Sequence, residues 1–441
     1  MQGQIPMRKT IAALLLAAST IAAAQTQSTA PAKNTADAKA SLKFVVIVTR
    51  HGVRSPTGKL DLLNRYSRQP WPAWSVPPGY LTEHGARLMT IFGAYDRQLL
   101  AAEGLLAPDG CADAARIRIV ADSDQRTRET GKALAAGLAP GCNVAVSALD
   151  QGTPDPLFHP LSAGAGPLDR QLAVAAVSGR IGANPQGLAE AYRAQLNALE
   201  EALGCGAATP CTGKDAEAPH SLFEIPAAVG AGKGDRGFEL STPLSLASTM
   251  TENLLLEYLE GKEVGWGRVD ADKLRYLLQL HTAAEEIALH TDYIARAQSS
   301  NLLDHLLRSM QQAADGHAIP SALSKPEDRL LILVGHDTNL ASIAGALGLN
   351  WLADGRCDDT PPGGALVFEL WKSSTNSQLS VRTYYTAQTL DQMRNTVPLS
   401  LAAPPERVPV FVPGCGRADG SCAWEAFEQT LGKAIDLAFV R

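Results

Sequence analysis

Three short apolar runs, each at the start of an expected strand-and-helix unit, constrain the fold of this chain most strongly. They are "FVVIV" at 44–48, "IRIV" at 117–120 and "LLILV" at 330–334. "TRETGKALAAGL" follows the second and "TNLASIAGALGL" follows the third, both with apolar residues at helical spacing. "GALVFELW" and "LSVRTYYT" are typical of further strands. Strands that alternate with helices predict an α/β fold with a mainly parallel central sheet flanked by helices.

Residues 166–295 have a different pattern. "LAEAYRAQLNALEEALG" places a single stripe of apolar residues on one helical face, and "LSLASTMTENLLLEYLEG" and "KLRYLLQLHTAAEEIAL" do the same. We therefore predict a smaller all-helical domain at 166–295, inserted between the two parts of the α/β domain at 41–165 and 296–441. The stripe consists of Leu188, Tyr192, Leu196, Leu199 and Leu203.

The N-terminus indicates export. Arg8 and Lys9 precede the apolar run "TIAALLLAASTIAAA", and Ala22 to Ala24 supply the small residues of a cleavage site. We predict a signal peptide at 1–24, a disordered polar linker at 25–40 and a periplasmic or secreted mature protein that is not held in a membrane. An uncleaved anchor or a hydrophobic tail is the alternative.

Seven cysteines fit an oxidising compartment. Cys205 and Cys211 are near neighbours, as are Cys415 and Cys422, while Cys111 and Cys142 flank one expected strand and helix. These three pairs are the predicted disulfides. Cys357 is left over, and we expect it to be structural or incidental.

The formal net charge is −6, with a pI near 5.9. Such a chain has no basic field that would hold nucleic acid or an anionic membrane. Any anionic ligand must therefore be bound by a local cluster of cations.

Each of the three apolar runs ends at a polar cluster. In open α/β sheets, ligands bind beyond the carboxyl ends of the strands, where helix N-termini point backbone N–H groups at anions. We therefore expect the three clusters to meet in one cleft. In chain order they contain Arg50, His51 and Arg54; Asp122, Arg126 and Arg128; and His336 and Asp337.

Arginine forks suit the paired oxygens of a phosphate group and stay charged at any useful pH. The clusters therefore predict a small-molecule phosphate monoester as substrate. One cluster alone would more often consist of ion-paired arginines and capped core histidines, but three at three strand ends favour a site.

"RHGVRSP" followed far downstream by "GHDTN" resembles the histidine acid phosphatase family, and "DSDQRTRETG" matches the family's internal arginine motif. "SLASTMTE", "GWGRV" and "TPPGGALVFELW" extend the resemblance to the family's bacterial periplasmic phytases, which also have general acid phosphatase activity. The resemblance covers essentially everything after the linker.

This resemblance implies that the chain hydrolyses phosphate monoesters, phytate in particular, as a monomer and without a cofactor. His51 matches the nucleophile that becomes a phosphohistidine, and Asp337 matches the general acid. The phosphate pocket and its surroundings are implied to contain Arg50, Arg54, Arg126 and His336, with Thr338 and Glu252 on the substrate side and Asp122 as a supporting acid.

We expect turnover without a metal, because the nine histidines show no H-E-x-x-H or paired-ligand spacing. "VGAGKGDRG" is interpreted as a flexible turn and not as a phosphate loop, because Gly234 follows Lys233 where Ser or Thr would be needed.

The chain departs from its close relatives at two cations. Gly58 separates Thr57 from Lys59 where the relatives carry a lysine directly after the threonine, and Gln298 stands where they have a basic residue. A cysteine pair that joins the helical region to the C-terminus in relatives has no match. Fewer cations could weaken the binding of phytate relative to simple monoesters.

Three other functions stay open. A sugar-phosphate phosphatase of the glucose-1-phosphatase type would share the mechanism. A cofactor-type phosphoglycerate mutase shares the RHG start, but an exported chain has little access to its pathway. An exported phosphate-binding protein without turnover is the alternative from another class.

Overall fold

The computed structural model describes residues 40–206, 209, 219–233 and 237–441. The predicted signal peptide and all of the predicted linker except Ala40 lie outside these residues. Within the described part of the chain, no helix is both long and apolar enough to cross a membrane.

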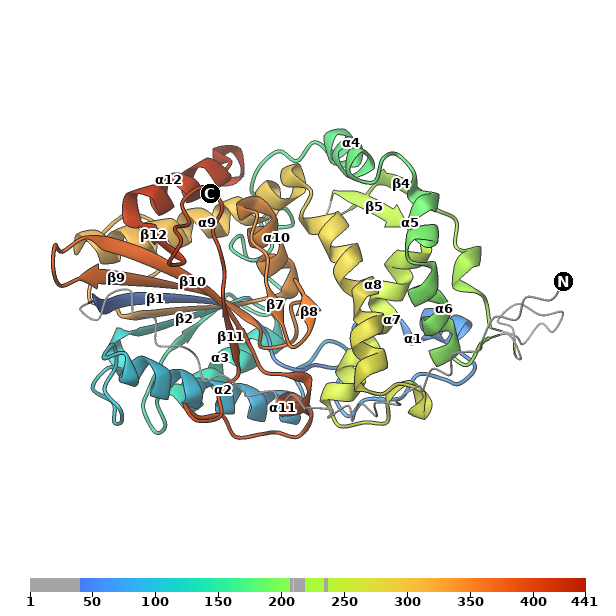
Figure 1. Ribbon diagram of the computed structural model, residues 1–441, viewed down its shortest axis with the longest axis horizontal. Coiled ribbons are helices and arrows are strands. Elements are labelled where there is room, and N and C mark those ends of the chain that lie inside the picture. The colour runs from blue at the N-terminus through green and yellow to red at the C-terminus, as the bar shows by residue number, and fades with distance from the viewer. Residues whose placement is uncertain (1–39, 207–208, 210–218, 234–236) are drawn as a thin grey trace, which may run out of the picture. The chain divides into compact units, whose positions relative to one another are not determined.

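A central sheet with strand order β11-β10-β9-β1-β6-β2-β3 organises the chain (Figure 1). Its core is parallel, as predicted: β1 (Ala40–Arg50) pairs with β6 (Leu330–Gly335), β6 with β2 (Ile117–Ala121), and β2 with β3 (Val146–Ser147). The other half is antiparallel and consists of β9 (Ala365–Ser373), β10 (Leu379–Ala387), β11 (Glu406–Pro409) and β12 (Ser421–Ala423). The short connection between β9 and β10 explains why these two strands are antiparallel, because only antiparallel strands can be joined by a tight turn.

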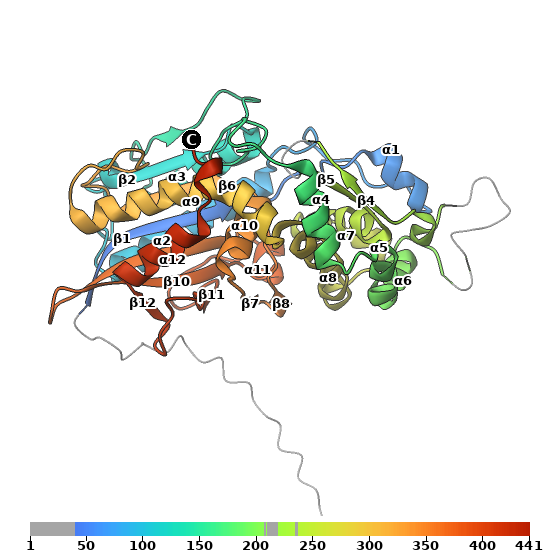
Figure 2. The same ribbon diagram turned by 90° about the horizontal axis from the view of Figure 1, so that it is seen from above.

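Helices cover both faces of the sheet (Figures 1 and 2). α2 (Glu83–Ala102) and α3 (Gln125–Leu138) pack on one face, and α9 (Asp292–Asp315), α10 (Asp337–Leu347) and α12 (Trp424–Ala434) pack on the other. β6 is buried at every position, which explains why its sequence is continuously apolar instead of alternating.

The region 166–295 contains the predicted helices. They are α4 (Arg170–Arg180), α5 (Pro185–Ala191), α6 (Arg193–Ala202), α7 (Pro243–Leu259) and α8 (Ala271–Leu289). Their apolar faces share one core, in which Leu196 and Leu199 are fully buried. We propose that this core marks an inserted domain, which packs against residues outside 166–295 such as Leu88 and Ala341.

One detail of that region differs from the prediction, because it is not all-helical. β4 (Ala228–Ala231) and β5 (Phe238–Ser241) form an antiparallel hairpin within it. Phe238 is buried in the helical core and Glu239 is exposed, while Val229 and Leu240 pack against the same core. Each strand has only four residues, which is too short to show a clear period. The remaining short elements are α1 (Leu60–Leu63), β7 (Leu352–Ala353), β8 (Arg356–Cys357) and α11 (Leu390–Arg394).

Two of the three predicted disulfides are confirmed, Cys111–Cys142 and Cys415–Cys422. Cys205 is also in a disulfide, and its predicted partner Cys211 lies outside the described residues. Cys357 is an exposed free thiol.

Candidate active site

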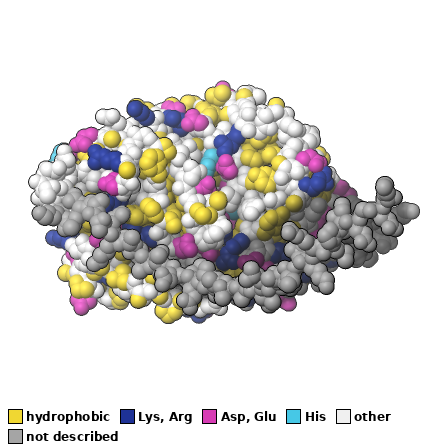
Figure 3. All heavy atoms as spheres, in the orientation of Figure 1, with side chains coloured by type: hydrophobic (Ala, Val, Ile, Leu, Met, Phe, Trp, Pro, Cys, Tyr) yellow, Lys and Arg dark blue, Asp and Glu magenta, His cyan; other side chains and the backbone are white. Residues whose placement is uncertain are grey.

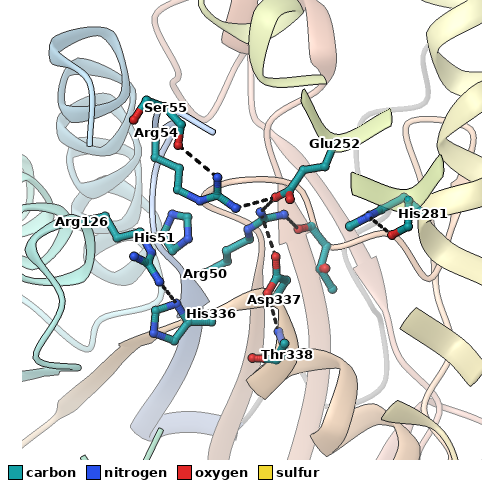
Figure 4. A network of polar contacts seen from close by, with 12 residues as sticks. Arg50, His51, Arg54, Ser55, Arg126, Glu252, His281, His336, Asp337 and Thr338 are labelled. Atoms are coloured by element: carbon teal, nitrogen blue, oxygen red, sulfur yellow. Dashed lines mark hydrogen bonds and ion pairs between the residues drawn. The ribbon is translucent and has the colours of Figure 1, made fainter. Parts of the chain in front are cut away.

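The carboxyl ends of three neighbouring parallel strands bring the predicted clusters together. β6 lies between β1 and β2, and Arg50 at the end of β1 pairs in register with Gly335 at the end of β6. His51, Asp122 and His336 follow directly after β1, β2 and β6. The expected single cleft is therefore formed at this edge of the sheet (Figure 4).

His51 is buried, with only 2% of its surface exposed. Its Nδ1 lies 2.8 Å from the backbone carbonyl of Gly52. A carbonyl oxygen can only accept, so in the neutral ring Nδ1 carries the proton and Nε2 keeps its lone pair. Burial, together with the positive charges of Arg126 and Arg50, holds the pKa of His51 well below its usual value. The ring is therefore neutral and nucleophilic even in mild acid.

Arg50 is fully buried beside two carboxylates. Its guanidinium donates to the backbone carbonyl of Thr360 at 2.6 Å, lies 2.8 Å from Asp337 and pairs with Glu252. Arg54 donates to the same oxygen of Glu252 at 2.9 Å. Glu252 thus holds the two guanidinium groups side by side, as Figure 4 shows.

These ion pairs set the charge of both carboxyl groups. Burial alone would raise the pKa of Glu252, but Arg54 and Arg50 lower it to about 2. Burial opposes ionisation of Asp337 in the same way, and Arg50 and Arg54 still hold its pKa well below the usual range. Both carboxyl groups are therefore ionised before a ligand binds.

His336 connects Arg126 to Asp122. Its Nε2 lies 2.7 Å from Asp122, and its Nδ1 lies 3.3 Å from the guanidinium of Arg126. Since a guanidinium only donates, Nδ1 is the acceptor and Nε2–H donates to the carboxylate. The rings of His336 and His51 lie with their centroids 5.6 Å apart, edge to face. This network places Arg126 next to His51.

A cavity of about 500 Å³ opens beside Asp337 and runs between α7, α8 and the β4–β5 hairpin. Figure 3 shows charged side chains of both signs and an imidazole gathered near the middle of the molecular face. The polar residues that line the cavity are Arg54, Thr57, Lys233, Glu239, Ser245, Ser248, Thr249, Glu252, His281, Glu285, Asp337 and Thr338.

Every predicted site residue lies at this cleft. The residues that converge at the strand ends in Figure 4 are Arg50, His51, Arg54, Arg126, His336 and Asp337. Asp122 accepts a hydrogen bond from Nε2–H of His336 at 2.7 Å. Glu252 and Thr338 line the cavity, and the backbone N–H of Thr338 donates to Asp337 at 2.7 Å. Arg128, which the motif analysis also noted, does not line the cavity.

The sequence analysis missed three residues near this site. Lys233 lines the cavity, although we interpreted its glycine-rich segment as a turn only. His281 is buried against Ser248 at 3.0 Å, and although burial lowers its pKa, Glu285 and Glu252 raise it overall. His159 lies 3.2 Å from Asp122. Its "DPLFHP" segment shows no periodicity that would have marked it.

The two departures from relatives do not fall in the cavity. Lys59 precedes α1 and lines a separate surface depression, while Gln298 is buried in α9. Neither residue lines the 500 Å³ cavity. In this chain Lys233 lines the cavity, whereas Lys59 does not.

A family model for the histidine phosphatase superfamily (branch 2) matches residues 41–185 and 257–386. The chain belongs to this superfamily. As a histidine phosphatase it is a phosphoric monoester hydrolase, and the matched residues include all three strand-end clusters.

Known histidine phosphatases resemble the chain over most of its length. It is 37% identical to Phytase AppA of Escherichia coli, over 90% of this chain and 93% of that protein. It is 29% identical to the Glucose-1-phosphatase of Providencia rettgeri, over 89% and 91% of the two chains. The structure of the Hafnia alvei phytase in complex with tartrate matches with a TM-score of 0.84 and 33% identity, over 92% of this chain and all of that one.

Proposed function

We propose that this histidine phosphatase hydrolyses phytate at acidic pH, through a phosphohistidine formed on His51. The observation that carries this proposal is the geometry of His51, whose Nδ1 donates to Gly52 while the buried ring lies among three arginines. That arrangement leaves Nε2 as the one ring atom able to attack phosphorus.

The first step transfers the phosphoryl group to the imidazole. Nε2 of His51 attacks phosphorus as the P–O bond to the leaving group breaks, and Arg50, Arg54 and Arg126 bind the phosphate oxygens. Their charges stabilise the transferring group, because they are fixed in a buried site before the substrate arrives. In the second step water attacks phosphorus and passes a proton to the carboxylate of Asp337, the P–N bond breaks, and inorganic phosphate leaves.

Asp337 supplies the proton for the leaving alkoxide, although it is ionised in the ligand-free site. A bound phosphate places negative charge beside Asp337. It also binds the guanidinium of Arg50, which pairs with the carboxylate of Asp337 when no ligand is bound. Both changes raise the pKa of the carboxyl group. Asp337 therefore gains its proton when substrate binds at acidic pH.

The cavity supports a substrate with more than one phosphate. It begins at Arg54 and Asp337, and Lys233 provides a second cationic side chain in its lining. A polyphosphorylated inositol could place one phosphate at His51 and another near Lys233. The 37% identity to Phytase AppA supports the same substrate.

A sugar phosphate is the second candidate. Four carboxylates line the cavity but only two lysine or arginine side chains do, and this excess of negative charge favours a substrate with a single phosphate. The four are Glu239, Glu252, Glu285 and Asp337. The resemblance to a Glucose-1-phosphatase supports this candidate as well. Acidic pH should favour phytate, because it lowers the negative charge of both the cavity and the substrate.

A substrate panel tests the proposal. Specificity constants for phytate, glucose 1-phosphate and an aryl phosphate are compared at acidic pH, with and without a chelator. We expect phytate to give the highest value and the chelator to leave it unchanged. A clearly higher value for glucose 1-phosphate would establish the second candidate, and absence of turnover on all three would favour a phosphate-binding protein.

We also propose that the mature chain is exported and begins near Gln25. The two disulfides support an oxidising compartment. N-terminal sequencing of the protein from a periplasmic fraction tests this. A mature protein that retains Arg8 and Lys9 would contradict it.

A further inference from the structure

Four potential metal ligands meet behind the phosphate pocket. Asp122, Asp124, His159 and His336 each offer one ligand atom, and these atoms all lie within 4.8 Å of one another. Asp122 and His336 belong to the site described above. His159 and Asp124 have no role in the proposed reaction.

We propose that these four residues form a binding site for a divalent transition-metal ion such as Zn²⁺, and that the bound ion inhibits the phosphatase. The metal site itself stands on the geometry of the four side chains. Only its inhibitory effect rests on the proposed function.

The distances fit a tetrahedral ion. The Nε2 atoms of His336 and His159 lie 2.7 Å and 3.2 Å from Oδ2 of Asp122, and Oδ2 of Asp124 lies 3.9 Å from Nε2 of His336. Ligands about 2.0–2.2 Å from zinc lie about 3.3–3.6 Å from one another in a tetrahedral site. All four atoms already lie within 4.8 Å of one another, so shifts of about 1 Å or less would bring them to that spacing, and two imidazoles with two carboxylates suit zinc.

An unpaired atom provides a second observation. Asp122 is fully buried, and its Oδ1 has no hydrogen-bond partner among the described residues. A buried carboxylate with one oxygen left without a donor is costly, and a cation bound at its other oxygen, Oδ2, would stabilise its charge. His159 and Asp124 have side chains that are 30% and 34% exposed, so an ion can reach the site from solvent.

The charges permit a cation here, although Arg126 is close. Two carboxylates face the four-residue site, and Arg126 pairs with one of them, Asp124, at 2.6 Å. The neighbourhood therefore keeps one net negative charge when both imidazoles are neutral. We expect binding to be weaker than at a structural zinc site for this reason.

Inhibition follows from the tautomer of His336. Its Nε2–H donates to Asp122, and its Nδ1 accepts from Arg126 at 3.3 Å. A metal on Nε2 displaces that proton, so the neutral ring must carry its proton on Nδ1. Nδ1–H would then face an N–H of Arg126, and two donors cannot form a hydrogen bond with each other. Arg126 must move, and the phosphate pocket loses one of its three arginines.

The test uses the full chain, freed of metal by a chelator, with Zn²⁺ or Co²⁺ as the only added ion. The assay substrate is an aryl phosphate at mildly acidic pH, because phytate itself binds zinc. The visible absorption of tetrahedral Co²⁺ reports binding independently of activity. His159→Asn removes one ligand, and His220→Asn is the matched control, since His220 pairs with Glu224 at 3.3 Å on the surface.

We expect zinc to inhibit the wild type and the His220→Asn variant equally. His159→Asn should raise the inhibitory zinc concentration at least 10-fold, because even outer-shell changes cost about 10-fold to 100-fold in metal affinity. The same variant should also lose the tetrahedral Co²⁺ spectrum. Equal zinc inhibition of wild type and His159→Asn, or no tetrahedral spectrum in the wild type, would overturn the proposal.

Circular dichroism shows whether His159→Asn is folded. If it is not, the Co²⁺ spectrum is measured on Asp124→Asn instead. Loss of the tetrahedral spectrum in Asp124→Asn supports the site, and an unchanged spectrum contradicts it. Because cobalt binding needs no turnover, the metal site can be confirmed or refuted even if the proposed function fails.

Discussion

The guanidinium of Arg50 lies 2.8 Å from the carboxylate of Asp337, which joins the last residue of β1 to the first residue of α10. This ion pair links the phosphate pocket to the proposed acid. A phosphate that binds Arg50 removes part of the charge that keeps Asp337 ionised. Proton supply and substrate binding are therefore coupled in our account.

Asp337→Asn should lower the activity on alkyl phosphates more than the activity on aryl phosphates. An alkoxide that leaves inositol is strongly basic and needs a proton, whereas a nitrophenolate leaves without one. General acid catalysis contributes about 10²-fold to 10⁴-fold, so we expect a loss of this size on phytate and a much smaller loss on an aryl phosphate. Steady-state kinetics on both substrates measures it. Equal losses would mean that Asp337 positions phosphate, and the acid role would pass to another residue such as Glu252.

Lys233→Gln should weaken phytate binding. The side chain lines the cavity beyond Arg54, where it can meet a second phosphate. Its exposure limits the effect to that of a surface ion pair, about threefold to fivefold in KM for phytate. KM for an aryl phosphate should not change. Lys59→Gln is the matched control because Lys59 lies outside the cavity, and an equal effect of both variants would refute a specific role for Lys233.

Glu257→Gln should stabilise the protein relative to wild type increasingly as the pH rises from about 4.5 to about 7. Burial raises the pKa of Glu257 to about 7, although the backbone N–H of Gly265 donates to its carboxylate. The folded state therefore binds this proton more tightly than the unfolded state, and the stability that the group contributes is lost as pH rises toward 7. Each pH unit between the two pKa values costs about 1.4 kcal/mol.

Urea unfolding at pH 4.5 and pH 8 measures this difference. Wild type and Glu257→Gln should have similar free energies of unfolding at the lower pH, because glutamine keeps the acceptor for Gly265. The variant should be more stable at the higher pH. A stability difference that does not change with pH would show that folding does not raise the pKa of Glu257.

The sequence predicted the catalytic edge of the fold because local patterns and sheet topology agree there. Continuous apolar runs marked β1 and β6 as buried strands, and the β-rich run "IRIV" marked β2. The carboxyl ends of neighbouring parallel strands meet at one edge of the sheet. The polar residues after each strand could therefore be grouped before any coordinates were known. The pairing of Arg50 with Asp337 could not be foreseen, because it depends on the register of β1 against β6.

The substrate side was less predictable because tertiary packing creates it. Lys233 follows β4 in irregular structure, as its glycine-rich sequence indicates, and only tertiary packing places it in the lining of the cavity. His281 sits mid-helix in α8, where a histidine ordinarily faces solvent or core, and only the packing of α7 against α8 places it beside Ser248. Gln298 is buried in α9, and Lys59 lies before α1 at a separate surface depression, so neither residue reaches the cavity.

The most direct test of the central claim is to trap the phosphoenzyme. The protein is mixed with ³²P-labelled substrate, quenched during turnover under conditions that preserve phosphohistidine, and digested for peptide mapping. Our account predicts label on the peptide that contains His51, and neither label nor turnover in His51→Ala. Label on any other residue, or wild-type turnover by His51→Ala, would contradict it.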